Sequence, residues 1–197
     1  MITGAVLAGG KSRRYGRNKA LEEFRGKRLI DYGLEALRSL CDPVFVVVND
    51  VSIYRHLEAT VIQDILPEQG PLGGIHTSLL FSPNEWVLVR ATDMPFFSPG
   101  VAGLMCEVKE GYDAVVPECN GLFEPLLALY HRRCIPCVAA VLERGERKTT
   151  RFYEKVRVRT LREEEWRALD PEGLSFINVN TLEDMEKIEW SFMKPGD

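Results

Sequence analysis

The 197-residue sequence is poor in cysteine and has no long uncharged hydrophobic segment. Its five cysteines are an odd, sparse set, which excludes a disulfide-stapled scaffold. No apolar run approaches the length of a membrane span, and the sequence begins with a predicted strand rather than a signal peptide. These absences predict a protein of the reducing cytoplasm that has no membrane partner.

One pair of cysteines, Cys134 and Cys137, forms a C-x-x-C motif. No second pair and no suitably spaced histidines complete a zinc site around it. A redox role is open, but we favour two cysteines on a helix beside Pro136. The three histidines lack metal-ligand spacing to one another, so we assign them no chemistry.

The sequence as a whole also has no excess of positive charge. The net charge of −4 argues against a general nucleic-acid or membrane-surface binder. A composition of 45% hydrophobic and 27% charged residues is typical of a globular protein. The length suits one ordinary domain with a full core, so we expect residues 1–197 to form a single domain.

Positive charge is nevertheless concentrated near the start of the chain. Between Lys11 and Arg28 there are eight Lys or Arg residues, against only Glu22 and Glu23. In an acidic protein this local excess suggests a small polyanionic ligand, and the alternative is a solvated surface. We favour the ligand, because a predicted strand and two glycines come directly before the basic segment.

The glycines belong to the stretch GGKS, which looks like the end of a P-loop. A P-loop needs G-x-x-x-x-G-K-[ST], and the position of its first glycine is Ala5, because Gly4 is one residue too early. The dinucleotide fingerprint G-x-G-x-x-G also fails, since Gly9 and Gly10 are adjacent and the next glycine is Gly16. The segment is therefore a different kind of phosphate-binding loop.

Short apolar runs rich in β-branched residues alternate with stretches of helical periodicity. This pattern predicts a three-layer α/β/α sandwich, with a mostly parallel Rossmann-like sheet covered by helices. The runs predicted as strands are 5–8, 44–48, 60–63, 86–90 and 114–116. Helices are predicted over 29–40 and 71–80, after Ser98 as an N-cap, and from Thr181 onward.

The pattern changes after residue 116. Asn120-Gly121 is a hairpin turn signal, and 124–130 returns as an apolar strand. Residues 155–161 alternate polar and apolar side chains, which indicates a half-exposed edge strand. We therefore expect a small antiparallel edge on the sheet.

Polar residues follow the predicted parallel strands one after another. The glycine-rich loop follows the first strand, Asn49 the second, Asp64 the third and Asp93 the fourth. Ligands of such sheets bind outside the carboxyl ends of the strands, so one crevice could collect all of these residues.

Asp93, in ATDMPF, is the candidate ligand of a divalent cation, because Mg²⁺ usually takes only one or two protein carboxylates. Its alternative is a turn or capping aspartate. Asp64 opens a loop rich in proline and glycine, which is either a substrate wall or a plain turn. Lys19 and Arg14 are candidate phosphate ligands, or else surface charges.

Near the end of the chain, Asn178 and Asn180 lie on the same side of a predicted extended segment. Their amides could bind a phosphate or a metal-bound water. Alternatively, one asparagine lies in a strand ladder and the other caps the last helix.

Together these residues resemble the nucleotidyltransferase superfamily and, within it, the molybdenum cofactor guanylyltransferases. The resemblance covers nearly the whole chain. It rests on five motifs: Leu7-Ala-Gly-Gly10 with Arg14, Gly16 and Lys19; Asp64-x2-Pro67-x2-Gly70-Pro71-Leu72; Asp93-Met94-Pro95; Glu124-Pro125-Leu126; and Asn178-Val-Asn180-Thr181. The first motif marks the superfamily, and the order and spacing of all five favour this subfamily.

The resemblance implies transfer of GMP from GTP to the terminal phosphate of molybdopterin, with release of pyrophosphate. The residues implied for GTP are Leu7, Ala8, Gly9, Gly10, Lys19, Asn49, Asp64 and Asp93. Catalysis is implied for Arg14, Lys19 and Asp93, with Mg²⁺ on Asp93, and contact with the pterin for Asn178 and Asn180. The implied partners are GTP and molybdopterin, and transient contacts with cofactor-biosynthesis proteins or apo-molybdoenzymes are possible.

Glu68 departs from the family pattern, because a small residue is common at that position. Three other functions stay open. Cytidylyl relatives usually carry Ala-Ala-Gly where this chain has Ala8-Gly9-Gly10, which favours guanine. Sugar-phosphate nucleotidyltransferases are usually longer. A nucleotide-binding regulator without turnover would not need Asp93, Arg14 and Lys19, all of which are present.

Overall fold

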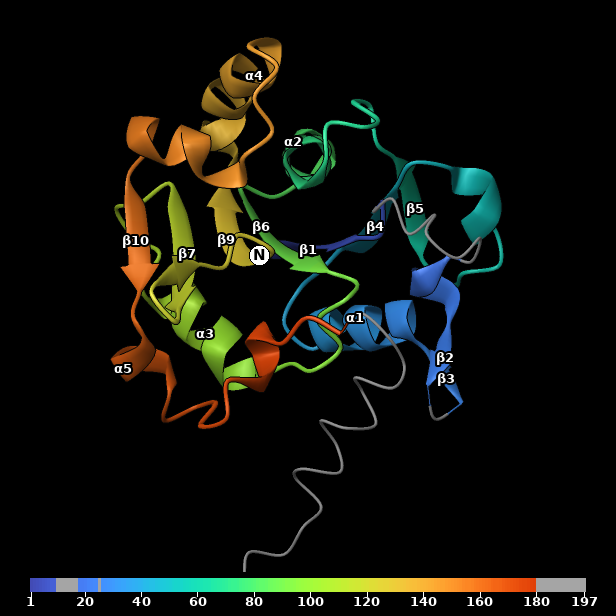
Figure 1. Ribbon diagram of the computed structural model, residues 1–197, viewed down its shortest axis with the longest axis horizontal. Helices are drawn as coiled ribbons and strands as arrows, with labels where there is room; N and C mark the ends of the chain where they lie inside the picture. Colours follow the sequence, from blue (N-terminus) through green and yellow to red (C-terminus); the bar gives the residue numbers. More distant parts are fainter. Residues whose placement is uncertain (10–17, 25, 180–197) are drawn as a thin grey trace, which may run out of the picture.

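The computed structural model describes residues 1–9, 18–24 and 26–179 of the chain (Figure 1). Gly10, Arg14 and Asn180, and the helix predicted from Thr181, lie outside these residues. The single domain expected for residues 1–197 therefore stays a prediction.

An eight-stranded mixed sheet forms the middle layer. Its strands are β1 (Ile2–Leu7), β4 (Val44–Val48), β5 (Thr60–Gln63), β6 (Trp86–Ala91), β7 (Ala114–Cys119), β8 (Leu122–Phe123), β9 (Leu127–His131) and β10 (Val158–Leu161). The spatial order is β10-β7-β9-β6-β1-β4-β5, and β8 pairs with β7. A separate two-stranded sheet joins β2 (Glu23–Phe24) and β3 (Lys27–Arg28).

Helices cover both faces of the main sheet (Figure 1). In the described part of the chain, the α-helices are α1 (Leu29–Arg38), α2 (Pro71–Phe81), α3 (Pro99–Glu107), α4 (Ile135–Glu143) and the short α5 (Glu163–Trp166). The 3-10 helices of the same residues are η2 (Lys19–Leu21), η3 (Val51–Tyr54), η4 (Arg132–Cys134), η5 (Thr149–Lys155) and η6 (Leu174–Phe176). Helices α1 and α3 pack on one face, and α2 and α4 on the other. The predicted three-layer sandwich is confirmed.

The central strands form because they are apolar on both faces. Alternate residues of β6 enter the two hydrophobic cores, Leu88 on the side of α1 and α3, and Val87 and Val89 on the side of α2 and α4. Strand β1 is parallel to both β4 and β6. Ser98 caps α3 as predicted, and its side chain accepts a hydrogen bond from Val101 N.

The antiparallel part lies differently from the prediction. Strand β9 is antiparallel to both β6 and β7 and lies between them, inside the sheet rather than at an edge. Asn120 and Gly121, with φ of 52° and 73°, turn the chain between β7 and β8 as the hairpin signal predicted. A connection this short returns the chain beside β7 in the opposite direction. The edge strand is β10, which is parallel to β7.

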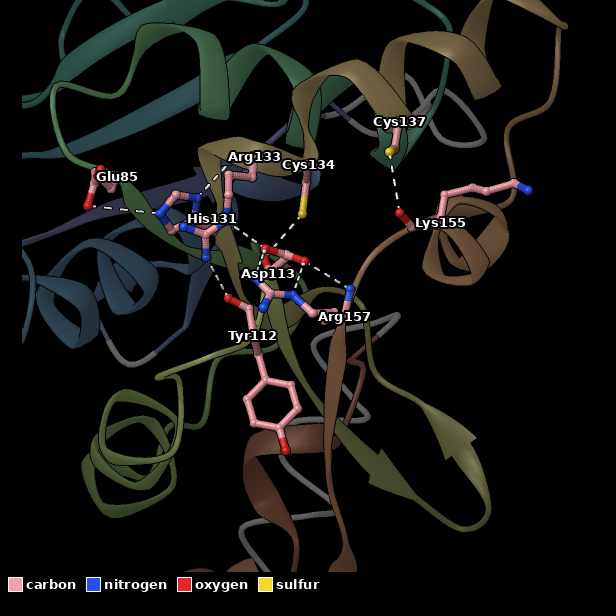
Figure 2. Close-up of polar contacts among 9 residues, drawn as sticks. All are labelled: Glu85, Tyr112, Asp113, His131, Arg133, Cys134, Cys137, Lys155 and Arg157. Atoms are coloured by element: carbon pink, nitrogen blue, oxygen red, sulfur yellow. Dashed lines mark hydrogen bonds and ion pairs between the residues drawn. The ribbon is translucent and has the colours of Figure 1, made fainter.

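A buried carboxylate joins the starts of β7 and β10 to the end of β9 (Figure 2). Asp113, only 8% exposed, accepts hydrogen bonds from Arg133 Nε at 2.6 Å and from Arg157 Nε at 3.1 Å. The peptide N–H of Arg157 adds a third bond at 3.0 Å. Hydrogen bonds from Arg157 come first among the causes that hold the pKa of Asp113 well below its ordinary value. This cluster lies where β7 and β10 begin, which is the end of the sheet opposite the predicted crevice.

Cys134 and Cys137 are free thiols near the start of α4 (Figure 2). Each donates to a different carbonyl group, Cys134 to Asp113 O at 3.1 Å and Cys137 to Lys155 O at 3.7 Å. Burial raises the pKa of Cys134 to about 12, which makes it a poor nucleophile at neutral pH. The placement at a helix beside Pro136 is as expected. Over the described part of the chain, every helix is too short or too polar to cross a membrane.

Candidate functional site

Four neighbouring parallel strands, β5, β4, β1 and β6, end at the same edge of the sheet. Asp64 follows β5, Asn49 follows β4, Ala8 and Gly9 follow β1, and Asp93 lies two residues beyond β6. The structure therefore brings to one edge the described residues that the sequence placed in a single crevice. Leu7, Ala8, Gly9 and Asp93 are half-buried, Asn49 is exposed and Asp64 is buried.

The end of β1 is held from both sides. Asn49 Nδ2 donates to Gly9 O at 2.6 Å, and a Cβ at Gly9 would lie 3.0 Å from Asn49 Oδ1. On the other side, Thr92 donates to Leu7 O through its N–H at 3.1 Å and its hydroxyl at 2.6 Å. A side chain at position 9 would therefore push against the Asn49 side chain, which would have to shift.

Lys19 begins η2, which is tied to the same strand end through Tyr54. The Tyr54 hydroxyl, on a side chain only 2% exposed, donates to Ala8 O at 3.1 Å and accepts from Asn18 Nδ2 at 2.8 Å. The backbone that carries Lys19 is thereby anchored beside the β1 loop. Sequence reasoning missed Tyr54, because nothing in its spacing connects η3 with residues 8 and 18.

Asp64 shapes the loop that follows β5. Its Oδ1 accepts from Thr77 Oγ1 at 2.6 Å and from Leu66 N at 3.1 Å. A Cβ at Gly73 would lie 2.9 Å from Leu66 O and 3.3 Å from Asp64 Oδ2, so α2 packs tightly against this loop. The hydrogen bonds support the turn interpretation, and contact with a nucleoside stays a prediction. Thr77 was missed, since only the fold brings α2 to Asp64.

The same loop contains Glu68, the residue at which the sequence departs from the family pattern. Glu68 has a φ of 69°, in the left-handed region that non-glycine residues rarely adopt. A small residue is common at this position, and glycine in particular would adopt the same backbone conformation with less strain. The chain therefore carries local strain beside Asp64 and Gly70.

Asp93 lies just beyond β6, on backbone that is fixed by its neighbours. Its carbonyl accepts from Val179 N at 2.8 Å, which places the exposed Asn178 in the segment beside it. Arg90 donates to the carbonyls of Met94 and Phe96, directly after Asp93. In the described part of the chain, no hydrogen bond or ion pair engages the Asp93 carboxylate. Its oxygens are open to a ligand.

Glu124 is a second carboxylate near Asp93. In the antiparallel β6–β9 ladder, Arg90 pairs with Leu127, and Ala91 N donates to Leu126 O at 2.9 Å. The segment before β9, which contains Glu124, therefore lies across from the residues that follow β6. Burial, and then the charge of Asp93, raise the pKa of Glu124. The sequence supplied Glu124 only as part of a motif, because its place opposite Asp93 depends on the antiparallel β9.

These donors fit a divalent cation held together with phosphates. Carboxylate oxygens are the ligands that Mg²⁺ prefers, and it usually keeps several waters and substrate oxygens. Among the residues described, no three acidic, histidine or cysteine side chains gather into a metal site. A cation of this kind at Asp93 would take further ligands from water and substrate. Gly10, Arg14 and Asn180 lie outside the described residues, so their place around it stays a prediction.

Residues 4–160 match the family model of the MobA-like NTP transferase domain. The chain is 37% identical over 190 residues to the molybdenum cofactor guanylyltransferase of Desulfosudis oleivorans, covering 95% of this chain and 94% of that protein. It is 36% identical over 196 residues to the probable molybdenum cofactor guanylyltransferase of Methanosarcina mazei, covering 93% and 88%.

Solved structures agree with these sequence matches. The crystal structure of molybdopterin-guanine dinucleotide biosynthesis protein A from Archaeoglobus fulgidus superposes with a TM-score of 0.83 at 32% identity, covering 98% of this chain and 100% of that one. The 4-diphosphocytidyl-2C-methyl-D-erythritol synthase of Anaerococcus prevotii, at 12% identity and a TM-score of 0.69, shares the fold alone.

Proposed function

The chain belongs to the family of MobA-like NTP transferase domains, and from this premise we propose that it transfers GMP from GTP to the terminal phosphate of molybdopterin, releasing pyrophosphate. The observation that carries the proposal is the 37% identity to a molybdenum cofactor guanylyltransferase over nearly the full length of both chains. The cluster of Gly9, Asn49 and Asp93 at the carboxyl edge of the sheet supports it.

GTP would lie over the loop that follows β1. Leu7, Ala8, Gly9 and Gly10 would offer backbone to the guanine and phosphates, since the small side chain of Ala8 and the absence of side chains at the two glycines permit close approach. Asn49, which already touches Gly9, would help to hold the nucleoside. Asp64 would help to hold the nucleoside from the neighbouring loop.

Nucleotidyltransferases of this kind generally use a divalent metal, and we infer Mg²⁺ held by Asp93. When bound, the cation would supply Lewis-acid stabilisation of negative charge on the phosphate oxygens. Asp93 is suited to holding it, because its backbone is fixed by Val179 and Arg90 while its carboxylate stays open. Glu124 is a second acidic side chain close enough to Asp93 for the charge of Asp93 to raise its pKa.

The remaining residues would position the substrates and neutralise charge. Phosphoryl transfer needs little covalent help from a protein, so these two effects provide most of the catalysis. Lys19 and Arg14 would stabilise the charge that develops on the departing pyrophosphate. Asn178 and Asn180 would orient the pterin phosphate, whose oxygen attacks the α-phosphorus of GTP while the bond to pyrophosphate breaks.

Pyrophosphate release tests this function directly. The purified protein is incubated with each of the four nucleoside triphosphates, Mg²⁺ and molybdenum-loaded pterin, and we expect release with GTP alone. Release with CTP but not GTP would show that the base assignment is wrong. GTP binding without release under all conditions would instead indicate a nucleotide-binding regulator.

Two substitutions test the site assignment. Lys19→Ala and Asp93→Ala should each lose most turnover while the fold survives, because a cation at the transferred phosphates contributes roughly a thousandfold or more in other phosphoryl enzymes. Lys27→Ala is the matched control, since Lys27 pairs with Glu35 at 2.6 Å on the surface. Near-normal rates in both site variants would show that the site is elsewhere. Transient contacts with apo-molybdoenzymes and a cytoplasmic location stay predictions.

A further inference from the structure

Arg90 is a buried cation in a strand that is otherwise apolar. It lies on β6 with no exposed surface. Its Nε donates to Met94 O at 2.9 Å, its Nη2 donates to Met94 O and, at 2.6 Å, to Phe96 O, and its guanidinium lies 4.9 Å from the centre of the Phe97 ring. Within residues 1–9, 18–24 and 26–179, Nη1 has no hydrogen-bond partner and no carboxylate pairs with the guanidinium.

A cation in this environment is costly for the fold. Burying a charge without a counter-ion costs several kcal/mol in real proteins, and a neutral hydrogen-bond acceptor recovers only part of this. Burial lowers the pKa of Arg90 to about 9, so the side chain still carries its charge at neutral pH. Leu88, two residues earlier on the same face of β6, is equally buried. An apolar residue at position 90 would suit the strand without the desolvation cost.

The contacts of Arg90 indicate what the charge provides. Both acceptors, Met94 O and Phe96 O, belong to the segment that follows Asp93, and Val179 N holds the carbonyl of Asp93 itself. The backbone on the carboxyl side of Asp93 is thus fixed from within the core. A fixed backbone sets the position from which the Asp93 side chain extends, and this placement is part of the preorganisation that a metal or phosphate site needs.

We propose that Arg90 is a positioning residue: it fixes the backbone beside Asp93 and thereby sets the place of the Asp93 carboxylate for its divalent cation. It touches neither substrate nor cation and acts through the Met94 and Phe96 carbonyls. The inference rests on the proposed function, in which Asp93 holds the cation. A purely structural Arg90 would affect the stability of the protein and leave its preference for metal-loaded nucleotide unchanged.

The test compares the affinity for GTP with Mn²⁺ to the affinity for GTP in EDTA, because their ratio isolates the contribution of the metal. Arg90→Met keeps an unbranched apolar stem and removes the guanidinium with its donors, while Arg90→Lys keeps the charge with a different donor geometry. Leu88→Ala is the matched control, a buried change on the same face of β6 that removes none of the hydrogen bonds to the Met94 and Phe96 carbonyls. Unfolding curves establish that each variant is folded at the assay temperature.

Arg90→Met should reduce the ratio about tenfold or more, with the affinity in EDTA unchanged within about twofold. Arg90→Lys should restore part of the ratio, and Leu88→Ala should leave it intact. If Arg90→Met fails to fold, Arg90→Lys carries the comparison, with a loss of at least about threefold expected. A ratio equal to that of Leu88→Ala in the folded Arg90 variants would overturn the proposal.

Asp93→Asn separates this inference from the function on which it rests. If Asp93→Asn abolishes the metal-dependent gain and the Arg90 variants keep it, the positioning role alone is wrong. If Asp93→Asn keeps the gain, Asp93 is not the metal ligand, and the roles of both residues are overturned.

Discussion

The substitution Gly73→Ala tests the packing of α2 against the Asp64 loop. An added Cβ would lie 2.9 Å from the backbone carbonyl of Leu66 and 3.3 Å from Asp64 Oδ2, closer than ordinary contacts. Overpacking of this kind costs about 1–3 kcal/mol. Replacing glycine by alanine in a helix gains up to about 1 kcal/mol. The net expectation is a loss of about 1 kcal/mol in the free energy of unfolding, or roughly 2–4 °C in Tm for a chain of this size.

Gly103→Ala is the matched control for Gly73→Ala. Gly103 lies in α3, and a Cβ there would meet nothing within 4 Å. Only the helix-propensity gain applies, so Tm should rise by about 2–4 °C. Thermal unfolding by circular dichroism measures both variants, and GTP titration should show weaker binding for Gly73→Ala alone. Equal shifts in Tm for the two variants would refute the tight contact between α2 and the Asp64 loop.

Two further predictions concern other parts of the structure. Tyr54→Phe removes the hydroxyl that joins Asn18 to Ala8, so it should lower the free energy of unfolding by about 1 kcal/mol and weaken GTP binding. An unchanged GTP affinity would contradict the role of this hydroxyl in anchoring the backbone that carries Lys19. Asp113→Asn should lower stability by about 2–4 kcal/mol at pH 7. Since the folded-state pKa of Asp113 is depressed, this stabilisation is present above the unfolded pKa of about 4 and lost as pH falls below it. Urea unfolding of both proteins should show the gap closing in acid, and a constant gap would contradict the ion-pair explanation.

The sequence predicted the parallel half of the sheet because each strand there is a short apolar run. Residues 44–48 and 60–63 are strands with the predicted bounds. The place of β9 could not be predicted, because a hairpin signal at Asn120 fixes the reversal of the chain but not which strand the returning segment joins. The predicted edge strand from 155 begins at Val158, since residues up to Lys155 form η5.

The candidate site was also predictable from the sequence only in part. Asn49, Asp64 and Asp93 were predictable because each directly follows an apolar run that reads as a strand. Tyr54, Thr77 and Glu124 were not given a role, since each reaches the site from an element whose neighbours only the fold determines. Arg90 is a different case, because a charged residue inside an apolar strand is visible in the sequence, but its acceptors Met94 O and Phe96 O are not.

A crystal structure with Mg²⁺ and a non-hydrolysable GTP analogue tests the central claim most directly. We expect the triphosphate at the carboxyl ends of β1 and β6, with the amine of Lys19 on its phosphates and the carboxylate of Asp93 on the cation. A triphosphate bound elsewhere, or a cation ligated without Asp93, would contradict it.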